Sequence, residues 1–135
     1  MTQDAHTIAR SFFAALSAAD LPDTLLTPDM TAWTTSSGVA SEKTSYQRGV
    51  AMLGTLFDGG LSFTVESLTA QDDRVAAEVR SHGTLVNGEP FANRYVFILR
   101  LRDGRIASVA EHFDPTPVQE KIRPLIQAAM ARKGP

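Results

Sequence analysis

Four segments in the second half of the chain alternate apolar and polar residues with a period of two, and this pattern constrains the fold most strongly. These candidate strands are residues 61–70, 74–85, 90–101 and 105–113. The connections between them are very short and contain turn-forming residues: Gln71-Asp72-Asp73, Asn87-Gly88 and Asp103-Gly104. Strands joined by so few residues pair antiparallel, so the pattern predicts a meander of consecutive hairpins.

The first half of the chain has the period of helices instead. Apolar residues recur at positions i, i+3 and i+4 over residues 5–16, which predicts an amphipathic helix that stops near Pro22. Pro22 can open a short helical turn through Leu26, and residues 30–34 are typical of a brief strand. The polar, glycine-containing residues 36–41 are expected to form a loop.

Two further helices are expected. The first starts at Thr44, which has capping-box spacing with Gln47, and it ends at Gly59-Gly60. The second begins at Pro117 and should be kinked by Pro124. Helices followed by a curved, mainly antiparallel sheet and a C-terminal helix predict an α+β fold. The length of 135 residues fits a single domain that spans residues 1–135.

Composition and charge exclude several classes of protein. No apolar run approaches the roughly 20 residues of a membrane span, and residues 1–4 lack the basic and apolar parts of a secretory signal. We therefore expect a cytoplasmic protein with no membrane partner. The chain contains no cysteine, which rules out disulfides and thiol chemistry. A formal net charge of −2 with scattered Lys and Arg gives no basic stripe for nucleic acid.

Metal and cofactor sites have no support in the sequence either. The three histidines are scattered and lack the spacing of metal ligands. No glycine-rich phosphate loop leads from a strand into a helix, and no serine nucleophile elbow is present. We therefore expect no metal and no cofactor, and a small molecule or a second protein as the partner.

Glu111 is the residue that most suggests chemistry. Alternation along the last candidate strand groups it with Val109 and Phe113, so its apolar neighbours should leave the carboxyl poorly solvated. Poor solvation raises the pKa of a carboxyl and suits it to proton transfer near neutral pH. The alternative is a carboxylate at the sheet surface, paired with Arg94 or Arg80, and a bulge in this strand would reverse the direction of its side chain.

The order of the elements and three sequence motifs connect the chain to a known family. The motifs are residues 88–97, 102–106 and 111–115. With them, nearly the whole chain resembles the SnoaL-like branch of the nuclear transport factor 2 superfamily, which includes ketosteroid isomerase, limonene epoxide hydrolase, polyketide cyclases and small phenazine-biosynthesis proteins. The resemblance implies a cone-shaped pocket enclosed by a strongly bent sheet and the helices.

Comparing the catalytic positions of these relatives one by one with this sequence argues against some of their activities. The tyrosine and two aspartates of the ketosteroid isomerases fall on or near other residue types: Phe12, Thr34 and Phe97. The Arg and Asp of limonene epoxide hydrolase fall on Ala76 and Glu78, so that pattern is broken too. Glu111 does match, because epoxide hydrolases have an Asp and phenazine-biosynthesis proteins a catalytic Glu at its position. The resemblance therefore implies that Glu111 is the proton-transfer group.

The strand over residues 74–85 separates polar from apolar residues. One face holds four polar residues, Glu78, Arg80, His82 and Thr84. This polar face is either the solvated outer surface of the sheet or, as the epoxide hydrolase resemblance implies, a wall of the pocket. In the second case Glu78 or His82 would lie near Glu111 as a second catalytic or orienting group.

Other residues are expected to line the pocket. Asn93 and Tyr95 are in phase with Phe97 and would supply hydrogen bonds from an otherwise apolar wall. The apolar body of the site is expected from these residues: Trp33, Tyr46, Met52, Phe57, Phe63 and Phe113. Packing in the core is the commoner fate of such side chains and stays open for each of them.

Glu111 and the resemblance together predict a cofactor-independent acid/base enzyme of the isomerase, cyclase, dehydratase or epoxide hydrolase type, acting on a small hydrophobic ring compound. One alternative is a non-catalytic protein that binds a hydrophobic ligand in the same cone. Another is a mainly structural dimerisation domain. Its interface would contain Val96 and Ile98, which face outward by alternation. A homodimer is expected in every case, because members of the family commonly pair through this sheet face.

Overall fold

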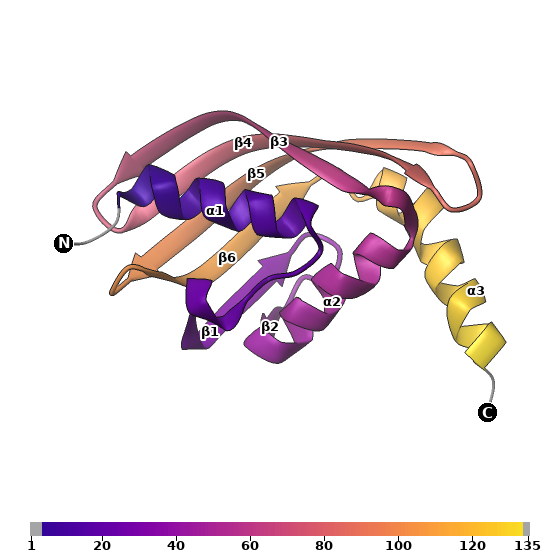
Figure 1. Ribbon diagram of the computed structural model, residues 1–135, viewed down its shortest axis with the longest axis horizontal. Helices are drawn as coiled ribbons and strands as arrows, with labels where there is room; N and C mark the ends of the chain where they lie inside the picture. Colours follow the sequence, from indigo (N-terminus) through magenta and orange to yellow (C-terminus); the bar gives the residue numbers. More distant parts are fainter. Residues whose placement is uncertain (1–3, 134–135) are drawn as a thin grey trace.

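A strongly curved sheet is the frame of the molecule (Figure 1). The computed structural model describes residues 4–133, and within this range the sheet has six strands in the order β2-β1-β6-β5-β4-β3. The strands are β1 Leu26–Thr34, β2 Ala40–Glu42, β3 Phe57–Gln71, β4 Arg74–Leu85, β5 Pro90–Arg102 and β6 Arg105–Phe113. Neighbours pair antiparallel except β1 and β6, which are parallel. The expectation about a secretory signal concerns residues 1–4, and residues 1–3 lie outside the described range.

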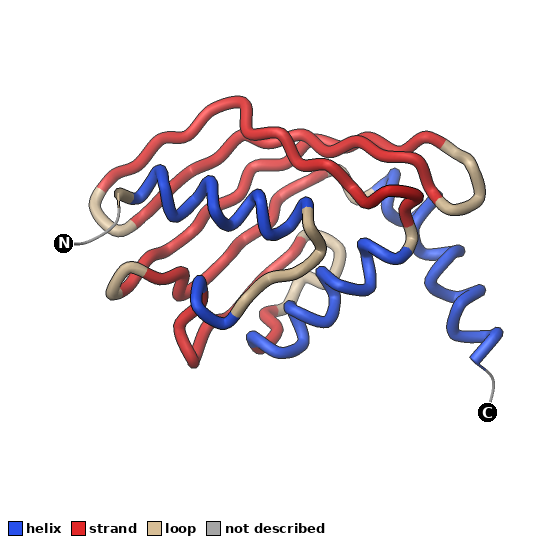
Figure 2. The backbone as a smooth tube through the Cα atoms, viewed as in Figure 1, coloured by secondary structure: helices blue, strands red, loops and turns tan. Residues whose placement is uncertain are grey.

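Helices cover the concave side and one end of the sheet (Figures 1 and 2). They are α1 Ala5–Ser17, the 3-10 turn η1 Asp23–Leu25, α2 Lys43–Thr55, the π-helical turn η2 Val118–Ile122 and α3 Arg123–Lys133. The amphipathic α1 lies in the hollow of the sheet, whereas α2 and the C-terminal segment close one end of it (Figure 1). This arrangement confirms the expected α+β class. Within residues 4–133, no helix combines the length and the apolar character needed to cross a membrane.

The structure confirms the meander expected in the second half. β4 and β6 have the bounds that the alternation predicts, and β3, β4, β5 and β6 follow one another as antiparallel neighbours. The hairpin turns use the left-handed backbone that their residue types favour, since φ is 54° at Asp72, 88° at Gly88 and 53° at Asp103. Local turn chemistry therefore determines the strand order in this half of the chain.

The end of the second helix differs from the sequence prediction. Gly59-Gly60 is predicted to stop the helix, but α2 ends at Thr55 and β3 begins at Phe57. The two glycines lie inside β3, with φ of 79° and 88°, where its pairing with β4 shifts register between Asp58 and Ser62. The shift is a β-bulge, and glycine adopts such positive φ values without strain. The glycines therefore bend a strand instead of ending a helix.

The N-terminal strands also differ from the prediction. β1 begins at Leu26, four residues before the predicted start, because Leu26 pairs with Ile106 of β6. β2 begins inside the predicted loop and ends one residue after it, since a three-residue edge strand has no alternation to reveal it. The capping box predicted for α2 does not form. Instead, the Gln47 side chain donates a 2.9 Å hydrogen bond to the backbone oxygen of Leu21 and ties α2 to the preceding loop.

The C-terminal helix begins with an irregular turn. The sequence predicts a helix from Pro117 that Pro124 kinks or interrupts, and the chain is helical here, as the π-helical turn η2 followed by α3. Pro124 has no N–H to donate to the carbonyl of Glu120, which an α-helix would require. The wider π turn lies immediately before this missing hydrogen bond. It also places Val118 and Ile122 toward the interior of the molecule.

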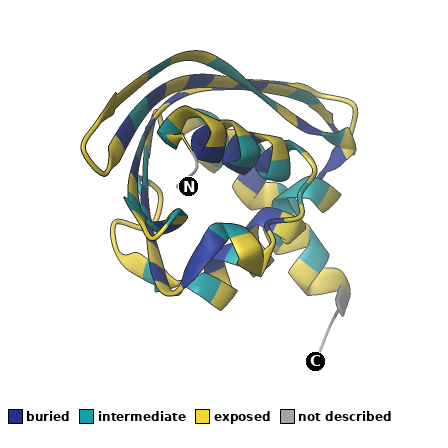
Figure 3. Cartoon of the chain, turned by 60° about the vertical axis from the view of Figure 1, so that its left-hand side comes forward, coloured by how far each residue is buried: buried dark blue, intermediate teal, exposed yellow. Residues whose placement is uncertain are grey.

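The core lies between α1 and the concave face of the sheet, where buried and exposed residues alternate along the strands (Figure 3). Its centre is a group of aromatic rings in edge-to-face contact, with ring centroids 5.2 Å apart for Phe12 and Phe13 and 4.9 Å apart for Phe13 and Phe97. A second apolar cluster includes Phe57, Phe91 and Ile122 and packs at the other end of the sheet. Residues from both clusters line the cavity described next.

Candidate active site

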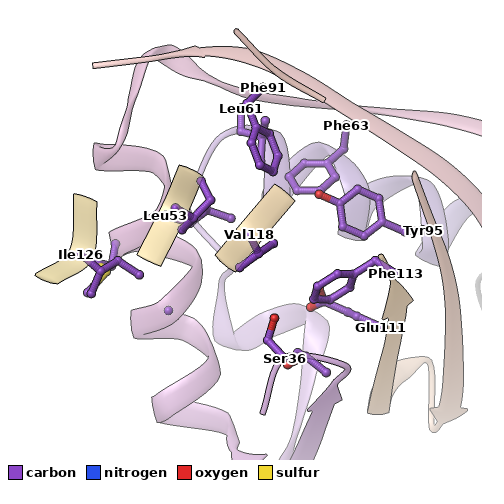
Figure 4. Close-up of a pocket in the computed structure, with 14 residues that line it drawn as sticks. Ser36, Leu53, Leu61, Phe63, Phe91, Tyr95, Glu111, Phe113, Val118 and Ile126 are labelled. Atoms are coloured by element: carbon purple, nitrogen blue, oxygen red, sulfur yellow. The ribbon is translucent and has the colours of Figure 1, made fainter. Parts of the chain in front are cut away.

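A cavity of about 420 Å³ opens between α2, the concave face of the sheet and the C-terminal helical segment (Figure 4). Its walls come from Thr34, Ser36, Gly49, Met52, Leu53, Leu61, Phe63, Phe91, Tyr95, Glu111, Phe113, Val118, Ile122 and Ile126. Among residues 4–133, Glu111 is the only Asp, Glu, Lys, Arg or His in this lining. A mostly apolar cavity of this size with a few polar groups is typical of a small-molecule site.

The pairing of β6 with its two neighbours aims Glu111 into this cavity. Glu111 pairs with Thr34 of β1 on one side and with Phe97 of β5 on the other. The end of β6 is held by Thr35, whose backbone N–H donates to the carbonyl of Glu111 at 3.0 Å and whose hydroxyl accepts from the N–H of Phe113 at 3.1 Å. The backbone on both sides of the carboxyl is therefore fixed.

The alternation that the sequence predicts for β6 holds as far as Phe113. The register with β5 shifts earlier, between Arg100 and Leu101, so it leaves the pairing of Glu111 and Phe113 unbroken. Both side chains consequently line the cavity on the same face as the buried Val109. The surface alternative, a carboxylate paired with an arginine, does not occur.

Burial gives the Glu111 carboxyl unusual titration behaviour. Loss of solvation raises its pKa to about 7, although the Tyr46 hydroxyl donates a hydrogen bond to Oε2 and opposes the rise. The pKa of Tyr46 is raised well above its usual value by burial and by the negative charge of Glu111. Tyr46 therefore stays protonated and remains a hydrogen-bond donor at neutral pH.

Tyr95 adds a second hydroxyl beside the carboxyl. It shares a 2.8 Å hydrogen bond with the buried hydroxyl of Ser81 on β4. Burial raises the pKa of Tyr95 to about 12, with a further rise from the charge of Glu111 and a partial offset from the Ser81 hydrogen bond. The hydroxyl therefore acts as a neutral hydrogen-bonding group in the wall of the cavity.

These groups can perform general acid or base chemistry. A carboxyl with a pKa close to 7 is present in both protonation states at neutral pH, which is the condition for efficient proton transfer in either direction. Thr34, Ser36 and Tyr95 offer hydroxyls that can orient a polar group of a ligand. The remaining walls are mostly apolar and offer a contact surface for an apolar body.

Several residues predicted for the site do meet at this cavity. Met52, Phe63, Tyr95 and Phe113 line it together with Glu111. The three aromatic rings among them pack on one another, with centroids 5.7 Å apart for Phe63 and Tyr95 and 5.6 Å apart for Tyr95 and Phe113 (Figure 4). Figure 4 shows this aromatic group on the same side of the cavity as Glu111.

Other predicted pocket residues have structural roles. Tyr46 borders a small adjoining pocket of about 40 Å³ and reaches the cavity only through its bond to Glu111. Phe57 packs in the core against Phe91, with ring centroids 5.5 Å apart. Asn93 is buried at the strand end, where its amide donates a 3.1 Å hydrogen bond to the backbone oxygen of Asp114. Neither Phe57 nor Asn93 lines the cavity.

Trp33 lies on the opposite face of the sheet from the one that was expected. Along β1, Ala32 is buried and Thr34 lines the cavity, so alternation turns Trp33 outward. Its ring packs on His112 of β6, with centroids 4.9 Å apart. The sequence gives no information on which face of an isolated short strand is buried, and this ambiguity caused the error.

Glu78 and His82 also lie on the outer face, which corrects the expectation that either lies near Glu111. Both are exposed, whereas Val79 and Ser81 between them are buried against the core. Glu78 accepts a 2.8 Å hydrogen bond from the hydroxyl of Ser67 on β3. The alternative of a solvated outer face is therefore the one that the structure shows for this strand.

Sequence reasoning missed part of the cavity wall. The missed lining residues are Thr34, Ser36, Gly49, Leu53, Leu61, Phe91, Val118, Ile122 and Ile126. The helical spacing of the last three can be seen in the sequence. The sequence does not show that the C-terminal helix closes the cavity. Within residues 4–133, no cluster of His, Asp and Glu is arranged to hold a metal ion.

Comparison with solved structures shows what this arrangement is similar to. AclR from Streptomyces galilaeus, described as a proposed hydroxylase, is 18% identical, with a TM-score of 0.74 over 86% of this chain and 92% of that one. IdmH from Streptomyces antibioticus, a proposed polyketide cyclase, is 20% identical, with a TM-score of 0.74 over 89% of this chain and 99% of that one. At these identities the similarity establishes the fold alone.

A third similar structure is a protein with a ketosteroid isomerase-like fold from Catenulispora acidiphila, solved in complex with trimethylamine. It is 19% identical, with a TM-score of 0.73 over 90% of this chain and 93% of that one. The search of curated proteins found no match. The family model of the SnoaL-like domain matches residues 9–109, which is most of the chain. The chain therefore belongs to the SnoaL-like domain family, as its motifs and its curved sheet indicate.

Proposed function

We propose that this protein is an acid/base enzyme that acts, without a cofactor, on a small and largely apolar ring compound in the cavity, with Glu111 as the proton-transfer group. The observation that supports this proposal best is a carboxyl with a pKa of about 7 at the wall of an apolar cavity of about 420 Å³. Perturbed carboxyls in cavities are a common property of catalytic sites.

The chemistry follows from the surroundings of Glu111. The Tyr46 hydroxyl holds Oε2, so the carboxyl keeps one orientation while it gains or loses a proton. Tyr95, Thr34 and Ser36 would orient a carbonyl or hydroxyl of the substrate. Isomerisation, cyclisation, dehydration and epoxide opening are all compatible with one such group. A single general acid or base contributes roughly 10²- to 10⁴-fold, so positioning of the substrate by the walls must supply the rest.

A second candidate function is non-catalytic binding of a hydrophobic ligand. It is favoured by the residues at the positions of the ketosteroid isomerase polar groups, since Phe12 and Phe97 are fully buried and pack together with ring centroids 6.1 Å apart. A binding protein needs no replacement for those groups. In this case Glu111 would recognise the ligand instead of transferring a proton.

The decisive variant is Glu111→Gln, which keeps the size of the side chain and removes the titratable proton. Ring ketones, ring epoxides and cyclisable diketones are screened for turnover, and the binding of any substrate found is measured separately. For a neutral substrate, the enzyme proposal expects binding within about threefold of wild type and a loss of turnover of about 10²-fold or more. Unchanged turnover would exclude Glu111 as the proton-transfer group. The matched control is Glu78→Gln, which removes the same charge on the outer face.

A further inference from the structure

The described lining of the cavity contains one carboxyl, that of Glu111, and no Lys, Arg or His. The titratable groups that face Glu111 are Tyr46 from α2 and Tyr95 from β5, and both keep their protons. His112 follows Glu111 on the same strand but points to the other face, where it packs on Trp33. Among residues 4–132, whose side chains the structure describes, none that lines the cavity supplies a counter-charge to an ionised Glu111.

One oxygen of the carboxyl also lacks a donor. The Tyr46 hydroxyl donates to Oε2, and within the described range no hydrogen bond is made to Oε1. Since Glu111 lines the cavity, a ligand can reach this oxygen from inside. A buried carboxylate is stabilised strongly by a charged donor and only modestly by a neutral one.

The rings around the carboxyl suit a positive charge. Phe63, Tyr95 and Phe113 form a continuous aromatic wall beside Glu111 (Figure 4). Aromatic faces attract ammonium groups, and the attraction is larger where water is excluded. A carboxylate and an aromatic wall thus meet in a cavity whose remaining lining is mostly apolar and includes the aliphatic side chains of Leu53, Val118 and Ile126.

We infer that the cavity selects ligands that carry a protonated amine on an apolar ring body, with the ammonium bound between Glu111 and the rings of Phe63, Tyr95 and Phe113. This inference rests on the proposed function only in taking this cavity as the substrate site. It adds the chemical class of the ligand. Neutral ligands would leave Oε1 with a weak partner, and anionic ligands would be repelled when Glu111 is ionised.

Charge pairing makes binding release a proton. An ammonium favours the ionised form of Glu111. Protein molecules in which Glu111 is protonated must therefore release this proton when the amine binds. With half of Glu111 protonated near pH 7, an amine that binds at this pH should release about half a proton. Affinity for the amine should rise about tenfold between pH 6 and pH 8, as the ionised fraction of Glu111 grows.

The test uses three probes with the same ring body, naphthylmethylamine, naphthylmethanol and naphthoate, and isothermal titration calorimetry in two buffers of different ionisation enthalpy. We expect the wild type to bind the amine at least about tenfold more tightly than the alcohol or the acid at pH 8. Glu111→Gln should remove both this preference and the proton release. Glu78→Gln, with the same change of net charge at the outer face, should retain both.

Two results would overturn the inference. One is an alcohol or acid that binds the wild type as tightly as the amine, including the case in which none of the three binds at millimolar concentration. The other is an amine preference that persists in Glu111→Gln. If that variant does not fold, the wild type still provides a test. An affinity for the amine that does not rise between pH 6 and pH 8 would also overturn the inference. The proposed function is judged separately by turnover of neutral ring compounds, so it survives if only the amine preference fails.

Discussion

At the scale of single residues, the protein places an acid where its charge is costly. The folded state raises the pKa of Glu111 from an ordinary 4.5 to about 7, chiefly because burial penalises the ionised form. A stable protein retains such a group at the expense of stability, which is typical of residues kept for function. The cost has a pH dependence that can be measured without knowing the substrate.

Stability should therefore fall as the pH rises from about 4.5 to about 7. Between these values the folded state binds more protons than the unfolded state, so the free energy of unfolding decreases with pH and then levels off. The shift corresponds to about 3 kcal/mol. Glu111→Gln should remove this dependence and be more stable than wild type at pH 8, as measured by urea unfolding at several pH values. A wild type that gains stability from pH 5 to pH 7 through this residue would contradict the assignment.

The hydroxyl of Tyr46 has an opposite effect on the same carboxyl. Its hydrogen bond favours the ionised form of Glu111, so Tyr46→Phe should raise the pKa of Glu111 further and move the corresponding limb of the pH–rate or pH–binding profile to higher pH. Titration of the Glu111 carboxyl by NMR measures the shift directly. A decrease of this pKa in Tyr46→Phe would show that the hydroxyl does not donate to the carboxyl in solution.

At the scale of elements, α2 positions the cavity wall because it packs closely on the loop after α1. A Cβ built on Gly54 would lie 2.3 Å from the Cβ of Ala19, whereas one built on Gly49 meets no atom within 4 Å. Ala19 has φ of 56°, so the loop is already in a restricted conformation and has little freedom to move away. The close approach therefore depends on the absence of a side chain at Gly54.

These two glycines form a matched pair for an experiment on the same helix. Gly49→Ala should stabilise the protein by about 0.5–1 kcal/mol, because alanine has the higher helix propensity and the space is open. Gly54→Ala should destabilise it by about 1–3 kcal/mol through the clash with Ala19. Thermal and urea unfolding measure both changes. Equal effects at the two sites would mean that α2 does not pack on this loop as described.

At the scale of the whole molecule, the outer face of the sheet is the surface with the clearest unassigned role. The exposed Val96, with 42% of its surface accessible, lies there between Glu78 of β4 and His112 of β6. Trp33 and Ile98 are also turned to this face and are only partly covered. The homodimer expected from the family resemblance would use this surface, and it stays a prediction.

A charge on this face should separate such a dimer. Val96→Lys would place a third cation between Arg94 and Arg100 of the same strand, so we expect a shift from dimer to monomer at micromolar concentration in analytical ultracentrifugation. Val86→Lys is the control, because Val86 is also exposed but lies in the turn between β4 and β5. A monomeric wild type, or the same behaviour of both variants, would contradict the predicted interface.

The sequence by itself determined the parts of this protein that depend on neighbours along the chain. Alternation and turn chemistry gave the bounds of β4 and β6 and the antiparallel meander, and the same alternation predicted that Glu111 shares a face with Val109 and Phe113. These patterns are local because a strand repeats every two residues and a tight turn is encoded by its own residues. The residue on which the proposed chemistry depends can therefore be identified from the amino-acid sequence alone.

Only the tertiary structure decided which faces meet. Period-two alternation shows that Glu78 and His82 share a face, but it does not show whether this face points into the molecule. Val79 and Ser81 on the other face are buried in the structure, so Glu78 and His82 point outward. The partnership of Tyr46 with Glu111 joins residues from α2 and β6 that are far apart in the chain. Such contacts depend on how the curved sheet wraps its helices. They arise from packing of whole elements, which no local pattern records.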